Sequence, residues 1–277
     1  MKTLYISDLD GTLLNNAAEI SDFTRAAINL LTSEYGVNFA VATARSEATA
    51  STILAGVNVN VPSALLNGVC IYDLKKRAYL NAECLTTLQS ERIFEVFDRF
   101  SLSAFIHTIE EGIHRTWVLG EETPFIADVI NKRKEKYGKV FTPVDSRFDC
   151  AGNMMYVSAL GSKEPLLSAA KRLRASPGLN VIFYPDTYIP ETWFLEISSA
   201  TASKKTAVQS IIKKFGFDRT VCFGDNLNDL PMFSVCDERY AVRNACEDLK
   251  RKSDAVIGNN SDNGVAEFLL NRFGAKL

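Results

Sequence analysis

The chain has 277 residues, with 31 basic and 33 acidic side chains, which gives a formal net charge of −2. At roughly 150 residues per domain, this length corresponds to between one and two domains, and such a chain needs no disulfide or metal to fold. The composition, 47% hydrophobic and 23% charged, excludes wholesale disorder. Because nucleic-acid and anionic-membrane binders usually carry a basic excess, the charge argues against both kinds of partner.

The N-terminus and the cysteines favour a cytoplasmic protein. The first apolar stretch is interrupted by Asp8 and Asp10, so we do not expect it to be a signal peptide, and no stretch has the apolar length of a membrane span. The six cysteines form no Cys-x-x-Cys pair and several lie in apolar runs. We therefore expect reduced, buried thiols rather than zinc ligands.

The first part of the chain alternates short apolar strands with amphipathic helices. Ser21 is a suitable N-cap for the first helix, and Gly36 a suitable end. The predicted elements are a strand at 3–7, a helix between these two residues, a strand at 37–42, a helix at 46–54, and strands at 64–66 and 69–72 around Asn67-Gly68. This β-α-β-α-β order indicates a parallel, doubly wound α/β core.

The middle of the chain has a different order. We predict a helix at 86–100, strands at 104–109 and 113–119, a helix from Pro124 through the charged residues to 136, a strand at 154–160, a helix at 163–174 and a strand at 181–184. A helix, a hairpin and then alternating elements are typical of an α+β unit with an open antiparallel sheet.

The last part returns to the first pattern. We predict a strand at 194–197, a helix at 203–215, a strand at 220–223, a helix at 227–235, strands at 240–242 and 255–257, and a helix at 264–273. The simplest account is one α/β core, formed by residues 1–82 and 191–277. An inserted domain at 83–190 interrupts it.

Two aspartates follow the first strand, in Asp8-Leu9-Asp10-Gly11-Thr12-Leu13-Leu14. Active sites of open α/β sheets lie at the carboxyl ends of the strands. Both carboxylates reach one small volume only if the strand alternation breaks, which Gly11 permits. Such a pair suits a divalent metal, or a nucleophile with an acid/base. The structural alternative is a turn capped by aspartates.

A second carboxylate-rich turn follows the strand at 220–223. Asp225, Asn228 and Asp229 offer the oxygen atoms that Mg²⁺ prefers, and Asp229 lies one helical turn after Asp225. The alternative is an ordinary helix cap. Two such clusters in one parallel core favour a site over two unrelated caps.

Two further segments suit a phosphate. Thr43, Ala44 and Arg45 follow the strand at 37–42, immediately before a helix whose N-terminus attracts anions. Lys204 opens the helix at 203–215, where the helix dipole disfavours a cation, so a negatively charged ligand would explain its place. The alternative for Lys204 is a solvated surface lysine.

Taken in order, these motifs resemble the haloacid dehalogenase superfamily of phosphatases, and within it the Cof-type, subfamily IIB branch with a large α/β cap. The resemblance covers nearly the whole core. The four motifs are Asp8-x-Asp10-Gly11-Thr12, Thr43 in Ala-Thr-Ala-Arg, Lys204, and Gly224-Asp225-Asn226-x-Asn228-Asp229; further matches are Asn67-Gly68, the segment 241–245 around Asn244, and Asn263-Gly264-Val265-Ala266. Lys205 and Asn226 depart from the common pattern, and we assign neither of them a function.

The resemblance implies a role for each motif residue. Asp8 is expected to be the nucleophile that carries an aspartyl-phosphate, and Asp10 the acid and base, kept protonated by a neighbouring carboxylate. Thr43 and Lys204 are expected to hold phosphate oxygens. The remaining assignments are Asp8, the Asp10 backbone carbonyl and Asp225 as Mg²⁺ ligands, Asn228 and Asp229 completing or orienting that shell, Arg45 as either a substrate contact or a surface ion pair, and Asn67 at a substrate position.

The inserted domain is expected to close over the site, exclude water and contact the leaving group. Its candidate contacts are His107, His114, Arg115, Trp117, Lys139, Asp186 and Tyr188, although Trp117, like Tyr184, is a better candidate for the core of the domain. The resemblance implies a Mg²⁺-dependent phosphatase acting on a small phosphate ester, with a sugar phosphate expected. A phosphosugar mutase and a non-catalytic phosphate sensor stay open; a dehalogenase is disfavoured because it would not need Asp10 or the metal carboxylates.

Overall fold

A computed structural model of the chain describes residues 1–144, 146–147, 150, 152–185 and 191–277. It forms two compact units, Met1–Asn81 with Ser203–Leu277, and Ala82–Ala202, which we describe separately. All six cysteines are free thiols, and most of them are buried. Within the described residues, no helix has both the length and the apolar character needed to cross a membrane.

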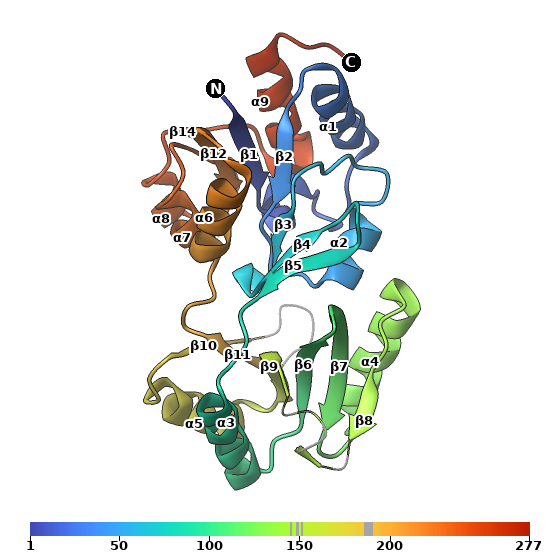
Figure 1. The fold of residues 1–277 in the computed structure, drawn as a ribbon, viewed down its shortest axis with the longest axis vertical. Coiled ribbons are helices and arrows are strands. Elements are labelled where there is room, and N and C mark those ends of the chain that lie inside the picture. Colours follow the sequence, from blue (N-terminus) through green and yellow to red (C-terminus); the bar gives the residue numbers. More distant parts are fainter. Residues whose placement is uncertain (145, 148–149, 151, 186–190) are drawn as a thin grey trace. The chain divides into compact units, whose positions relative to one another are not determined.

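The first unit is built on a parallel five-stranded sheet, which confirms the predicted α/β core (Figure 1). The strand order is β14-β13-β12-β1-β2. The strands are β1 (Thr3–Ser7), β2 (Asn38–Val41), β12 (Arg219–Gly224), β13 (Glu238–Ala241) and β14 (Ala255–Val256). Because β1 pairs directly with β12, the carboxyl ends of these two strands lie side by side.

Helices lie on both sides of this sheet (Figure 1). Their bounds are α1 (Asp22–Glu34), α2 (Glu47–Ile53), α6 (Lys204–Phe215), α7 (Leu230–Phe233), α8 (Glu247–Lys250) and α9 (Gly264–Phe273). The predicted N-cap of α1 is confirmed, since the Ser21 hydroxyl accepts a hydrogen bond from Thr24 N at 3.0 Å. The helix expected at 227–235 is shorter, a 3₁₀ turn at Leu227–Asp229 followed by α7.

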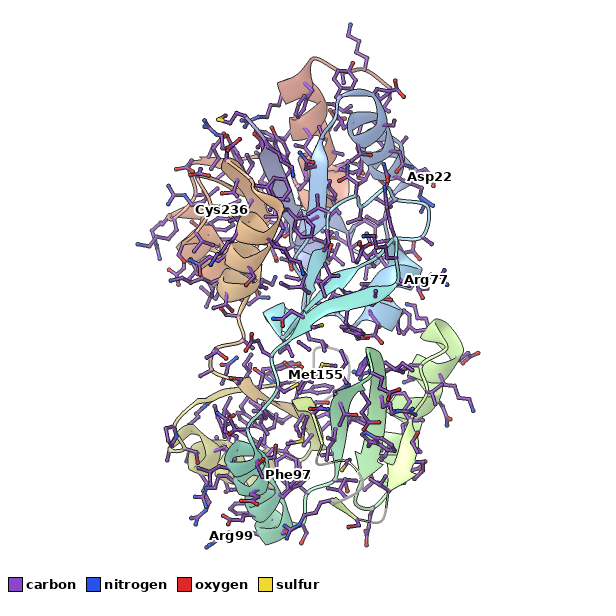
Figure 2. All side chains as sticks on the ribbon, viewed as in Figure 1. Asp22, Arg77, Phe97, Arg99, Met155 and Cys236 are labelled. Carbon is purple, nitrogen blue, oxygen red and sulfur yellow. The ribbon has the colours of Figure 1, made fainter. Side chains whose placement is uncertain are left out.

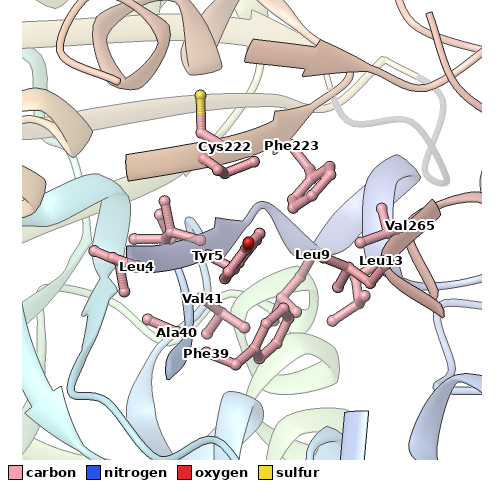
Figure 3. Packing of buried hydrophobic residues seen from close by; sticks show 14 of the residues in the cluster. Leu4, Tyr5, Leu9, Leu13, Phe39, Ala40, Val41, Cys222, Phe223 and Val265 are labelled. Carbon is pink, nitrogen blue, oxygen red and sulfur yellow. The ribbon is translucent and has the colours of Figure 1, made fainter. Parts of the chain in front are cut away.

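Helices on both faces leave the central strands buried on both sides. Leu4 and Ile6 on one side of β1, and Tyr5 on the other, are all at most 5% exposed. Figure 3 shows Phe39 and Val41 of β2 and Phe223 of β12 packed around β1 in the same cluster. This packing fixes the position at which β1 ends and therefore the position of the residues that follow it.

The Asn67-Gly68 segment connects the first two strands of a small second sheet in this unit, with the order β3-β4-β5. The strands are β3 (Ser63–Leu65), β4 (Cys70–Asp73) and β5 (Ala78–Ala82), the last of which the sequence did not predict. The turn uses positive φ at Leu66, Asn67 and Gly68. A Cβ at Gly68 would lie 2.1 Å from the Ser203 carbonyl oxygen, so only glycine allows the hairpin to approach the start of α6 this closely.

The second unit is a six-stranded, mainly antiparallel sheet with helices on both faces, as expected for an α+β unit. Its elements are α3 (Thr87–Phe100), β6 (Ala104–Glu110), β7 (Ile113–Leu119), α4 (Pro124–Tyr137), β8 (Thr142–Val144), β9 (Met154–Gly161), α5 (Lys163–Arg174), β10 (Leu179–Pro185) and β11 (Trp193–Ser199). Alternation along β6 places Ile106 in a cluster with Phe97 of α3, and Phe105 in a smaller cluster with Ile126 of α4. Figure 2 labels Phe97 on α3.

The strand expected in the core at 194–197 is β11, and it belongs to the second unit instead. It pairs antiparallel with both β9 and β10, so this unit extends to Ala202 rather than to 190. An apolar strand fits the interior of either sheet, and its partners are set by contacts distant in sequence. The boundary between the two units therefore lies at Ala202 and not at residue 190, because the pairing of β11 depends on contacts that the local sequence pattern does not contain.

Candidate active site

The chain leaves β1 through a turn that carries the first motif. Asp8 continues the pairing with β12, since its backbone N–H donates to Phe223 O at 3.0 Å. Leu9–Leu13 then forms one wide helical turn, closed by the Leu14 N–H donating to Leu9 O at 2.9 Å. Gly11 takes φ +76°, which an L-residue with a side chain rarely adopts. The strand alternation breaks here, as expected.

The carboxylates of Asp8, Asp225 and Asp229 come together at the ends of β1 and β12. Each offers an oxygen, and these oxygens lie within 4.8 Å of one another. Gly11 makes this possible, because a Cβ there would lie 2.4 Å from Asp225 Oδ2. The Thr12 hydroxyl donates to Asp225 Oδ1 at 3.2 Å. Asp8 and Asp229 are buried, so neither is a solvated turn cap.

Lys204 lies between two of these carboxylates. Its Nζ donates to Asp8 Oδ1 at 2.6 Å and to Asp229 Oδ1 at 2.7 Å, and the side chain is 1% exposed. The alternative of a solvated surface lysine is therefore wrong. The Ser203 hydroxyl caps α6 and fixes where the helix begins, while Lys205 is exposed.

The electrostatics show an excess of negative charge. Burial raises the pKa of the Asp8 carboxyl well above its usual value, Lys204 opposes that rise, and Asp229 adds to it. Burial, and then the charge of Asp229, raise the pKa of Asp225 to about 6. For Lys204 burial lowers the pKa, but Asp229 and Asp8 outweigh it, so the ammonium stays protonated. Three carboxylates therefore lie near a single ammonium group, that of Lys204. Their oxygen atoms form a donor set that fits a hard divalent metal ion.

Asp229 is placed to orient its neighbours. Its Oδ1 accepts from Lys204, and its Oδ2 accepts from the backbone N–H groups of Asp225 and Asn226 at 3.0 and 3.2 Å. A Cβ at Gly224 would lie 2.7 Å from Asp229 Oδ2, so the glycine makes room for this carboxylate. Asn228 is exposed on the same turn.

Asp10 is not one of the three clustered carboxylates, and its side chain pairs with Arg45. We expected a neighbouring carboxylate to influence Asp10. The two carboxylates do interact, because the charge of Asp10 contributes to raising the pKa of Asp225. The side chain of Asp10 is 50% exposed and bonds directly to the Arg45 guanidinium, so its role as acid and base stays a prediction.

The second motif lies between β2 and α2, beside the Asn67-Gly68 turn. Thr43 is fully buried, and its Oγ1 accepts from Arg45 N at 3.1 Å. The Asn67 N–H donates to Thr43 O at 2.9 Å. Asn67 Oδ1 is buried without a hydrogen-bond partner among the described residues, whereas Ala44 is exposed. Thr43 and Asn67 therefore lie together, and the turn also contacts the start of α6.

The candidates in the second unit make contacts within that unit. His107 is buried, its Nδ1 lies 2.9 Å from His114 Nε2, and its ring packs edge-on against Tyr156. Burial, and then the charge of Lys139, lower the pKa of His107. Arg115 pairs with Glu110 at 3.4 Å. Asp186 and Tyr188 lie outside the described residues.

The two aromatic residues expected in the core of this unit differ. Trp117 packs against the larger cluster and donates from Nε1 to Thr108 Oγ1 at 2.8 Å, which confirms the expectation. Tyr184 is 37% exposed and donates to Glu196 Oε1 at 2.7 Å, so its assignment to the core is wrong.

Two contacts around the carboxylate cluster had no role in the sequence interpretation. Thr12 supports Asp225, and Asn244 donates from Nδ2 to Gly11 O at 2.7 Å. Both residues belong to matched motifs, but local spacing does not reveal a bond between segments more than two hundred residues apart.

The chain matches known proteins along nearly its whole length. The sequence model of the haloacid dehalogenase-like hydrolases matches residues 5–269. The 5-amino-6-(5-phospho-D-ribitylamino)uracil phosphatase YwtE of Bacillus subtilis is 29% identical, over 97% of this chain and 97% of that protein. The pyridoxal phosphate phosphatase YbhA of Escherichia coli is 19% identical, over 95% of each chain.

Solved structures show the same fold. A haloacid dehalogenase-like hydrolase from Bacteroides thetaiotaomicron has a TM-score of 0.80 at 21% identity, over 98% of this chain and 100% of that chain. The subclass IIB sugar phosphatase BT4131 has a TM-score of 0.75 at 18% identity, over 99% of each chain. At these identities the likeness of the structures shows a shared architecture.

Proposed function

The chain belongs to the haloacid dehalogenase-like hydrolase family, and from that membership we propose that it is a Mg²⁺-dependent phosphatase of a small phosphate monoester. One observation carries the proposal: Lys204 is buried between Asp8 and Asp229, next to the carboxylate of Asp225. A buried cation among buried carboxylates at strand ends is an arrangement suited to an anionic substrate. A buried ion pair stabilises a fold little relative to apolar packing, so its presence here favours a functional role.

The acidic cluster fits the metal. Asp8 and Asp225, with the Asp10 backbone carbonyl and Asn228, would hold Mg²⁺, and Asp229 would orient this set through its bonds to the loop. When bound, Mg²⁺ would neutralise the carboxylates and the charge of the phosphate oxygens.

The residues of the chain divide the remaining chemistry. An Asp8 oxygen attacks phosphorus, the bond from phosphorus to the ester oxygen breaks, and Asp10 gives a proton to the leaving alcohol. Water then attacks the aspartyl-phosphate, loses its proton to Asp10 and releases phosphate and free Asp8. Lys204 holds a phosphate oxygen and offsets the repulsion between two anions.

Thr43 and Asn67 complete the phosphate and substrate contacts in this proposal, with Ala44 and Arg45 beside them. The buried Asn67 Oδ1 supports this role, because a buried polar atom without a partner is costly unless a ligand supplies one. We also propose that the Ala82–Ala202 unit selects the leaving group and that the enzyme acts in the cytoplasm. A sugar phosphate is our first candidate substrate. Phosphate esters of heterocyclic compounds are the second, because YwtE and YbhA are named as phosphatases of such esters.

The proposal is tested with a panel of phosphorylated metabolites, assayed for phosphate release with Mg²⁺ and with EDTA. Asp8→Asn should abolish phosphate release and retain the fold, and Asp22→Asn, an exposed control on α1, should retain activity. Activity of Asp8→Asn at the wild-type rate would refute the mechanism. Product analysis on hexose 1-phosphates distinguishes a mutase, which would form an isomeric hexose phosphate. The absence of turnover on the whole panel would indicate a non-catalytic sensor.

A further inference from the structure

Asn244 connects the first motif to the loop after β13. Its Nδ2 donates to Gly11 O at 2.7 Å, and its Oδ1 accepts from Asn260 N at 3.1 Å. Both ends of one amide are therefore used, each on a backbone group of a different segment. An amide carries its donor and its acceptor on separate atoms, so it can bridge two backbone groups, whereas an ionised carboxylate cannot donate.

Asn260 extends the connection to the other end of the same turn. It is 5% exposed, and its Nδ2 donates to Leu14 O at 2.9 Å and to Asn16 Oδ1 at 3.2 Å. Together, Asn244 and Asn260 hold the carbonyl groups of Gly11 and Leu14. We call these two residues the asparagine brace.

The turn needs such support because regular pairing ends where it begins. The ladder between β1 and β12 reaches Asp8 N and Phe223 O, and the chain then turns away from the sheet. Gly11 must nevertheless lie against Asp225, where even a Cβ would lie 2.4 Å from Oδ2. A small displacement of Gly11 would therefore change the distances among Asp8, Asp225 and the Asp10 carbonyl.

We infer that the asparagine brace is a positioning device for the metal-binding turn, with Asn244 as its central residue. Asn244 touches neither the phosphate nor the metal in this scheme. It acts through Gly11, by holding the Asp8–Leu14 segment at the distance from Asp225 that the site requires. The part of the inference that concerns Mg²⁺ rests on the proposed function, whereas the part that concerns the rigidity of the turn does not.

The test compares Asn244→Ala with Asn60→Ala. Asn60 makes the same two-ended bridge elsewhere in the first unit: its Oδ1 accepts from Phe39 N at 2.8 Å and its Nδ2 donates to Val37 O at 2.9 Å. Both variants lose two bonds to the backbone, so a general loss of stability should affect them alike. Only Asn244→Ala should affect the turn.

Two measurements are made on each protein. Hydrogen exchange without metal should show faster exchange of the amides at 10–14 in Asn244→Ala, by about tenfold or more, and no such change in Asn60→Ala. Calorimetry should show Mg²⁺ affinity about tenfold weaker in Asn244→Ala only.

The outcomes separate the two proposals. Unchanged amide exchange at 10–14 in Asn244→Ala, or an equal increase in Asn60→Ala, would overturn the inference that the asparagine brace holds the turn. Faster exchange with wild-type Mg²⁺ affinity would overturn its role at the metal site. If the wild-type protein binds no Mg²⁺, the proposed cofactor fails, and the exchange data still decide whether the brace holds the turn.

Discussion

Arg45 binds both carboxylate oxygens of Asp10 through one edge of its guanidinium. Nε donates to Oδ2 at 2.7 Å and Nη2 donates to Oδ1 at 2.5 Å, while the two side chains are 18% and 50% exposed. This fork-to-carboxylate geometry fixes the carboxylate as well as attracting it. The structure therefore supports an ion pair for Arg45 and identifies its partner as the proposed general acid.

If Arg45 orients Asp10, Arg45→Ala should lower kcat by about tenfold to a hundredfold, since a positioned acid or base contributes roughly 10²–10⁴ in rate. KM should change little, because the phosphate contacts remain. Unfolding free energy should change by less than about 1 kcal/mol, as expected for a partly exposed pair. Steady-state kinetics on an aryl phosphate measure both constants.

The matched control is Arg239→Ala, which removes a similar two-point pair with Asp254 at the edge of the sheet. It should leave both kinetic constants unchanged. A rise in KM at constant kcat in Arg45→Ala would instead show that Arg45 binds the phosphate, which was the other interpretation of its position in the sequence.

Local patterns in the sequence predicted most elements and the residues of the carboxylate cluster, because periodicity, caps and strand ends are local properties. Strand β11 was assigned to the wrong sheet, since an apolar strand does not encode its partners. The pair of Arg45 with Asp10 and the bond of Asn244 to Gly11 were missed for a similar reason. They depend on side-chain directions between segments that only the folded chain brings together.

Glu238 on β13 joins three elements of the first unit and should stabilise it at neutral pH. It accepts from Arg272 of α9 at 2.6 and 2.8 Å, from Arg219 at 2.9 Å and from Tyr240 at 2.6 Å. The bonds from Arg272 lower the pKa of Glu238 from its usual 4.5 to about 2; burial opposes this, and Tyr240 adds to it. Because the pKa is lowered in the folded state, the stabilisation is present above pH 4.5 and is lost as the pH falls towards 2.

Glu238→Gln should therefore cost about 1–3 kcal/mol of unfolding free energy at pH 7, as expected for hydrogen bonds to a charged group. The difference from wild type should narrow as the pH falls below 4.5. Urea unfolding of both proteins between pH 7 and pH 3 measures this difference in unfolding free energy. Glu247→Gln, which removes an exposed pair with Lys250, should cost almost nothing. If the stability difference between Glu238→Gln and wild type grew on acidification, ionised Glu238 would not be the source of the stabilisation.

The contact of Gly68 with the start of α6 makes the sharpest prediction for the site. Gly68 has φ +91°, and a Cβ would lie 2.1 Å from Ser203 O and 2.7 Å from Lys204 N. Both are backbone atoms, so no flexible side chain can move aside. Gly68→Ala should cost more than about 3 kcal/mol, because steric overlap adds to the cost of the positive φ.

The control, Gly36→Ala, isolates the backbone cost. Gly36 has φ +67°, and no atom lies within 4 Å of the position that an alanine Cβ would take, so the substitution should cost about 1 kcal/mol. Any Gly68→Ala protein that remains folded should release phosphate slowly, because relief of the overlap moves the first turn of α6 and with it the Lys204 ammonium, which lies 2.6 Å from Asp8. Equal losses of stability in the two variants, with wild-type turnover in Gly68→Ala, would show that the hairpin does not set the position of Lys204.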